Sequence, residues 1–208
     1  MSLGLDFATF GILIASIILH EISHGAVALS LGDDTAKRAG RLTLNPIPHI
    51  DPIGSVVLPL VLLVSGAPVL FGWAKPVPVN VGRLRHPRND AVLTGLAGPA
   101  TNFILVGVAI VALRWLHPES YWPFILLAYL GIINLILGCF NMLPIPPLDG
   151  SALIERLIPG RWWRHYLAIR PYTLLIVLGF VFFARSTAAY NDAINWLQDH
   201  FLSASGYA

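Results

Sequence analysis

The stretch from Leu5 to Leu31 is almost entirely apolar, yet it carries His20, Glu21 and His24. As an α-helix it would be roughly 40 Å long, enough to cross a bilayer. Only 12% of the 208 residues are charged and 56% are hydrophobic, whereas soluble domains carry about 25% charged residues. The composition therefore predicts an integral membrane protein. Ionisable groups are costly inside a membrane and usually serve a function there, so these three side chains are the first candidates for a site.

Further apolar segments predict an all-α polytopic membrane protein with about four transmembrane helices. The segments 91–113 and 121–142 are long enough to span a bilayer, and 172–184 is a shorter span or an interfacial helix. No linker or repeat divides the chain, so we expect one membrane-embedded domain, 1–208, that ends in amphipathic and apolar helices over 159–208.

Two kinds of irregular segment lie between these spans. The apolar segment 53–71 is broken by two prolines and a glycine, which predicts a segment that enters the membrane and returns on the same side. Alternating side chains near 41–44, and alternating valines between prolines at 74–81, predict short β-strands.

The basic residues favour that re-entrant topology. If the segment 53–71 returns to its own side, the loops 32–52, 72–90 and 143–171 share one face of the membrane. Eleven of the thirteen basic residues then lie on that face, and only Arg114 and Arg185 lie on the other. Because cytoplasmic loops carry the excess of Lys and Arg, this face is predicted to be cytoplasmic.

Composition excludes some other classes. The net charge of +2 is too small to suggest a nucleic-acid partner, and the single Cys139 allows no internal disulfide. The N-terminal apolar stretch lacks a basic n-region and a cleavage pattern, so we expect it to remain in the mature protein.

The spacing of His20 and His24 points to a metal. Residues four apart on a helix lie on one face, so both imidazoles can reach one ion. In HExxH metalloproteases the glutamate, here Glu21, acts as general base. The alternative is a chance motif whose histidines merely pack in a helix bundle, which would bury three ionisable groups without evident partners.

A catalytic zinc usually has three protein ligands, and Asp149 is the candidate for the third. It follows an apolar span and a proline-rich turn. On spacing alone it would instead be the N-cap of a helix over 150–158, a common use of Asp. If 53–71 is re-entrant, however, Asp149 reaches the same side of the membrane as His20 and His24.

Four segments together resemble the site-2 protease family of intramembrane zinc metalloproteases. They are "HEISHG", "NMLPIPPLDG", "AGPATN" and "GWAKPVPVN". The resemblance covers roughly residues 5–158, which would form the catalytic core, and leaves no room for a PDZ or CBS domain. It implies an endopeptidase that holds one Zn²⁺ per chain and cuts transmembrane segments of other membrane proteins. It also implies a multi-pass protein in the lipid bilayer of a cell membrane, expected to be a bacterial cytoplasmic membrane, with its site near the cytoplasmic face.

The same resemblance implies roles for six residues. The zinc ligands would be His20, His24 and Asp149. Glu21 would be base and acid, and Asn102 and Asn141 would lie near the substrate channel.

Three other functions are alternatives to this interpretation. A metal or proton transporter would use the His/Glu cluster as an ion pathway, but it would need polar groups that continue to the opposite face. An inactive binder of membrane helices would not need all four candidate residues. A prenyl-protein protease would typically take a glutamate as third ligand, where this chain offers Asp149.

Overall fold

The computed structural model describes residues 3–65, 73–173, 175, 179, 183 and 187–207. Its α-helices are α1 (Leu3–Ser30), α2 (Thr35–Arg38), α3 (Leu58–Val64), α4 (Pro87–Leu116), α5 (Tyr121–Asn141), α6 (Ser151–Leu157), α7 (Gly160–Ile169) and α9 (Ala188–Ser205). Short helical turns are η1 (Ile47–His49), the π-helical η2 (Pro52–Val57), η3 (Val81–Arg83) and η4 (Arg170–Tyr172).

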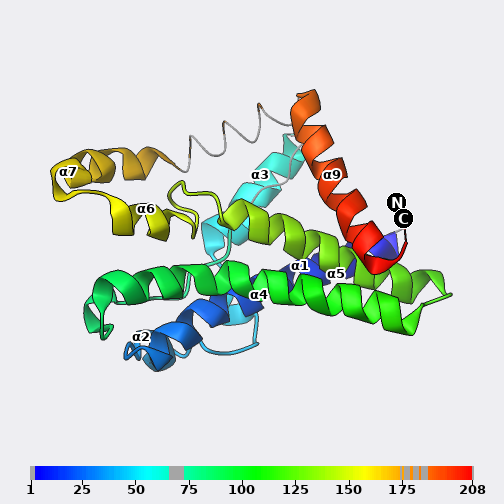
Figure 1. Cartoon of the computed structure of the whole chain (residues 1–208), viewed down its shortest axis with the longest axis horizontal. Helices are drawn as coiled ribbons and strands as arrows, with labels where there is room; N and C mark the ends of the chain where they lie inside the picture. Colours follow the sequence, from blue (N-terminus) through cyan, green and yellow to red (C-terminus); the bar gives the residue numbers. More distant parts are fainter. Residues whose placement is uncertain are drawn as a thin grey trace.

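Three helices within the described residues are long and apolar enough to cross a membrane: Ala8–Ser30 of α1, α4 and α5. The polypeptide is therefore a multi-pass membrane protein. The helices α4 and α5 lie side by side, and α1 packs against both (Figure 1). The sequence predicted about four such helices, and the fourth candidate, 172–184, lies for the most part outside the described residues.

The helix α9 closes the bundle at one end. Its Phe201 is 2% exposed and packs with Ala109 and Leu113 of α4 and Ala128 of α5. A Cβ at Gly131 of α5 would lie only 2.0 Å from the Phe201 ring, so a glycine is needed for α9 to approach this closely.

The chain between α1 and α4 begins and ends at one place. The Arg85 N–H, just before α4, donates to the carbonyl of Leu31, just after α1, over 3.0 Å. Within this excursion the Trp73 N–H donates to the Gly54 carbonyl over 3.2 Å, and the Ser55 hydroxyl donates to the Trp73 carbonyl over 2.8 Å. The end of α1 and the start of α4 thus share one side of the membrane, as a re-entrant 53–71 requires, although residues 66–71 lie outside the described part.

The predicted β-strands near 41–44 and 74–81 are wrong. Both segments lie within the described residues, and neither forms a strand. Two carbonyls that a strand ladder would use accept from side chains instead. The Arg41 guanidinium donates to the Lys75 carbonyl (2.6 Å), and the His49 imidazole donates to the Thr43 carbonyl (2.9 Å).

The segment 74–81 has no free row of donors for a ladder either. Its two internal prolines have no N–H, and three other N–H groups already have acceptors elsewhere in the molecule. Lys75 donates to the His49 carbonyl, Val77 to the Glu21 carboxylate, and Asn80 to the Asp33 carboxylate.

Asp33 fixes this extended segment to the end of α1. Its side chain is completely buried and accepts from the Asn80 N–H (2.6 Å) and from the N–H (3.0 Å) and hydroxyl of Thr35. Neighbouring Asp34 is partly exposed and forms ion pairs with Arg38 and Arg83.

We predict that Asp33→Ala destabilises the protein far more than Asp34→Ala. Each buried donor left without an acceptor costs about 1–3 kcal/mol, whereas surface ion pairs contribute about 0–1 kcal/mol. Thermal unfolding in detergent, followed by circular dichroism, compares the two variants. Equal melting temperatures would contradict the anchoring role of Asp33.

Candidate metal centre

His20 and His24 lie one turn apart on α1 and face α4. Their exposed fractions are 7% and 8%, and their Nε2 atoms lie 3.1 Å apart. The rings are nearly perpendicular, with centroids 4.8 Å apart. A Cβ at Gly98 of α4 would lie 2.4 Å from atoms of both rings. The glycine therefore provides the space in which the imidazoles meet.

The other nitrogen of each imidazole has a partner on α4. His24 Nδ1 lies 2.7 Å from the Thr94 carbonyl, and His20 Nδ1 lies 2.6 Å from the Asn102 side-chain oxygen. A backbone carbonyl can only accept, so His24 carries its proton on Nδ1 when neutral. The Asn102 oxygen requires the same of His20. Both Nε2 atoms then present lone pairs to each other.

Asp149 completes the cluster from the turn between α5 and α6. Its Oδ2 lies 3.0 Å from His20 Nε2, and its Oδ1 lies 3.4 Å from His24 Nε2. The side chain does not serve as an N-cap, the alternative role that spacing alone suggested, because α6 begins after Gly150 without a side-chain cap.

Gly150 lets this turn close on the end of α5. Its N–H donates to the Asn141 carbonyl over 2.7 Å. A Cβ at Gly150 would lie 2.2 Å from the Met142 carbonyl oxygen. The pairing of aspartate with glycine in "LDG" thus has a steric reason, since the turn that carries the carboxylate packs directly against backbone.

The donor set fits a zinc ion. The three ligand atoms lie within 4.8 Å of one another. Tetrahedral zinc with bonds of about 2.0–2.2 Å places its ligand atoms about 3.3–3.6 Å apart. The two Nε2 atoms lie 3.1 Å apart, and they lie 3.0 and 3.4 Å from Asp149 Oδ2 and Oδ1, respectively. Two neutral imidazoles and one carboxylate are ligands that zinc accepts. Lone pairs facing one another in a buried site also need a cation between them.

Glu21 is held beside this cluster by backbone. Its Oε2 accepts from the Val77 N–H over 2.8 Å. Val77 lies between Pro76 and Pro78, so it supplies the only N–H of that tripeptide. One carboxylate oxygen of Glu21, Oε2, is thus fixed by the backbone.

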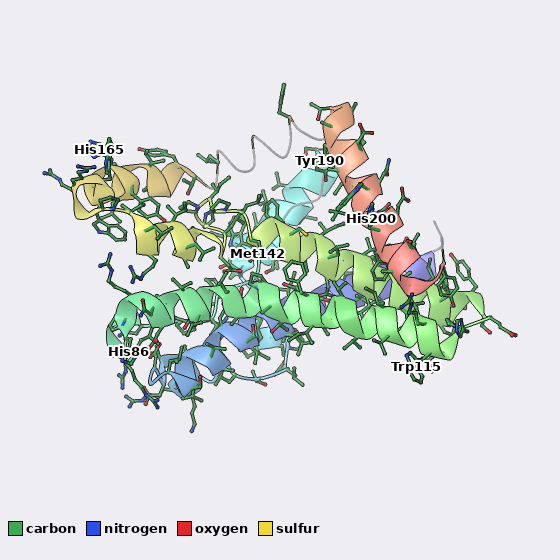
Figure 2. All side chains as sticks on the ribbon, in the orientation of Figure 1. His86, Trp115, Met142, His165, Tyr190 and His200 are labelled. Atoms are coloured by element: carbon green, nitrogen blue, oxygen red, sulfur yellow. The ribbon has the colours of Figure 1, made fainter. Side chains whose placement is uncertain are left out.

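The cluster opens into a cleft of about 1810 Å³. Most of its lining is apolar and comes from α1, the extended segment 73–81, the N-terminal part of α4, the C-terminal part of α5, α6 and α9. Tyr190, labelled on α9 in Figure 2, lines it together with Ile194 and Leu197. An open cleft with apolar walls can admit an extended peptide as well as water.

The two asparagines implied by the resemblance lie in different places. Asn102 is fully buried and contacts His20 directly. Asn141 lines the cleft, but its amide donates to the Leu137 carbonyl of its own helix over 3.0 Å. The structure therefore brings Asn102 to the imidazole pair and leaves Asn141 on the cleft wall.

Four residues around the cluster were not predicted from the sequence to be parts of the site. Residue type alone does not reveal that the Thr94 carbonyl accepts a hydrogen bond or that Gly98 provides space. Asn134 and Ser16, which continue the hydrogen bonds of Asn102, do leave one, because each is an isolated polar residue in an apolar span. Polar residues of this kind typically hydrogen-bond with neighbouring spans.

Comparison with known proteins agrees with this cluster. The profile of peptidase family M50 matches residues 119–184. The "Putative zinc metalloprotease YwhC" of Bacillus subtilis is 44% identical over 157 residues, which are 71% of this chain and 67% of that protein. The "Putative zinc metalloprotease Rip2" of Mycobacterium tuberculosis is 30% identical over 201 residues, 93% of this chain and 75% of that protein.

The chain belongs to peptidase family M50. The resemblance to site-2 proteases is therefore confirmed, and the transporter alternative gains no support. The Rip2 protein of Mycolicibacterium smegmatis is 28% identical over 92% of this chain and 73% of its own length. No solved structure matches.

We predict that Gly98→Ala prevents metal binding, because its methyl group would occupy the place of the imidazole edges. Gly107→Ala on the same helix is the matched control, since a Cβ there meets nothing within 4 Å. Zinc content of the purified variants, measured by mass spectrometry, tests this. Full zinc occupancy in Gly98→Ala would contradict the close approach.

Proposed function

We propose that this M50 protein hydrolyses peptide bonds in or near transmembrane segments of other membrane proteins. It would hold one zinc ion through His20, His24 and Asp149. The observation that carries the proposal is the meeting of these three side chains from α1 and the α5–α6 turn, with separations of 3.0, 3.1 and 3.4 Å. Two neutral imidazoles and a carboxylate leave a fourth position for water or substrate.

The residues divide the chemistry between them. When bound, zinc would lower the pKa of a water molecule and polarise the scissile carbonyl. Glu21 accepts the proton that this water loses and returns it to the leaving nitrogen. The Val77 N–H fixes Oε2 of Glu21, so the carboxylate keeps its orientation while Oε1 exchanges the proton.

The site is proposed to lie near the cytoplasmic face of a bacterial cell membrane. His24 is six residues from the end of α1 at Ser30, which is about 9 Å along a helix. The ends of α1 and α4 on that side adjoin the basic loop residues Arg83 and Arg85. Water can therefore reach the cleft from this side, while the apolar walls admit a substrate segment from the bilayer.

The first test of the chemistry is Glu21→Gln. The amide oxygen still accepts from Val77, so the segment stays in place, but the side chain no longer takes a proton. We expect zinc content to remain stoichiometric and cleavage to fall by at least about 100-fold. Quantitative proteomics of membranes from cells with active protein and with the variant would identify fragments that depend on Glu21. Identical fragment patterns would remove Glu21 from the mechanism.

The second test concerns the third ligand. We expect Asp149→Ala to lower zinc affinity by more than the ~10–100-fold that loss of an outer-sphere partner costs. Competition with a chromogenic chelator measures this affinity. Asp51→Ala serves as control, because Asp51 is another loop aspartate with hydrogen bonds of its own, to two backbone N–H groups at the start of η2, but lies outside the cluster. Unchanged affinity in Asp149→Ala would contradict ligation.

A further inference from the structure

A chain of buried amides leads away from His20 through three membrane helices. The Asn102 amide on α4 donates to the Asn134 oxygen on α5 over 2.8 Å. The Asn134 amide donates to the Ser16 hydroxyl on α1 and to the Leu130 carbonyl, each over 2.8 Å. Asn102 and Asn134 are 0% exposed and Ser16 is 1% exposed. Together these residues form a hydrogen-bonded chain that links α1, α4 and α5.

The hydrogen bonds of this chain have a fixed direction. A side-chain amide can rotate to exchange its oxygen and nitrogen, but the Leu130 carbonyl can only accept. Asn134 must therefore turn its nitrogen toward Leu130 and its oxygen toward Asn102. Asn102 must then turn its nitrogen toward Asn134 and its oxygen toward His20. This final oxygen accepts only if His20 carries its proton on Nδ1.

We infer that Asn134, acting through Asn102, positions the proton of His20 on Nδ1 and so keeps Nε2 free as a ligand. This rests on the proposed zinc site. Asn134 is not a lining residue of the cleft and hydrogen-bonds to Asn102, Ser16 and Leu130, so it is a positioning residue and not a catalytic one. His24 needs no positioning residue, since the backbone carbonyl of Thr94 accepts from its Nδ1–H directly.

Packing of the helices alone does not account for this hydrogen-bonded chain. Polar residues in spans often only hold helices together, but that purpose does not require the amides to meet a histidine. The arrangement found here instead ends on a backbone carbonyl at one end and on a ligand imidazole at the other. Its direction leaves His20 Nε2 without a proton, so a cation between Nε2 and the Asp149 carboxylate, which are 3.0 Å apart, finds a lone pair to bind.

The test reads the His20 proton directly in metal-free protein. Long-range ¹H–¹⁵N NMR of ¹⁵N-histidine-labelled protein in detergent distinguishes protonated Nδ1 from protonated Nε2, at a pH that keeps the imidazole neutral. The His20 signal is assigned by its loss in His20→Ala. We expect a single Nδ1–H form in the wild type and a mixture in Asn102→Leu and Asn134→Leu, which remove the acceptor and the orienting amide respectively.

Zinc affinity is the second readout. Loss of an outer-sphere partner typically costs ~10–100-fold in metal affinity, which we expect for Asn102→Leu, with a smaller loss of about tenfold for Asn134→Leu. Asn102→Asp should keep the Nδ1–H form and near-normal affinity, because one carboxyl oxygen still accepts from His20. Ser205→Ala, which also removes a buried hydrogen bond, controls for general loss of packing and should leave both readouts unchanged.

Three results would overturn the inference: a wild-type His20 protonated on Nε2, an Asn134→Leu protein with a pure Nδ1–H form and normal zinc affinity, or a Ser205→Ala protein altered as much as Asn134→Leu. If Asn134→Leu unfolds, Asn102→Leu against Asn102→Asp decides the question, since equal tautomer mixtures in both would overturn it. A wild type that shows the Nδ1–H form but binds no zinc would instead refute the proposed function.

Discussion

Two imidazoles buried among apolar helices require a partner for every nitrogen, and this requirement orders the centre of the molecule. Both Nδ1 atoms find acceptors on α4, the Thr94 carbonyl and the Asn102 side chain. That pairing brings α1 against α4 so closely that only a glycine, Gly98, fits beneath the rings. The Nε2 atoms are left to point into the cleft. One arrangement thus satisfies the buried polar atoms and exposes the ligand atoms.

The same pairing dictates how the chain must run outside the spans. Thr94 is the eighth residue of α4 and His24 the seventh from the end of α1, so the end of one helix must adjoin the start of the other. The Arg85–Leu31 hydrogen bond closes this junction. A segment that crossed the membrane completely between them would separate the imidazoles from their acceptors. Because the segment between α1 and α4 does not cross the membrane completely, it can fold over the cleft, where it supplies Val77.

Features that depend on local spacing could be predicted, and features that depend on distant partners could not. Helical periodicity alone places His20 beside His24, and the charge bias of the loops was enough to bring Asp149 to the same side. The β-strands at 41–44 and 74–81 were wrong because alternation describes side chains, not hydrogen bonds. Whether an N–H pairs with a strand or with Asp33 depends on residues far away in sequence. Asn134 was missed for the same reason, since an isolated Asn does not disclose its partners.

The segment 74–81 also explains how one buried aspartate bears on the candidate base. Asp33 holds the Asn80 N–H, and three residues earlier the Val77 N–H holds Glu21. Pro76 and Pro78 flank Val77 and restrict its backbone, so a constraint applied at Asn80 is transmitted along a stiff chain to the glutamate. Without it, the carboxylate would have to be held by a side chain or by water. A backbone donor between two prolines loses little conformational entropy when it binds, which makes it well suited to orient a group that must exchange a proton without moving.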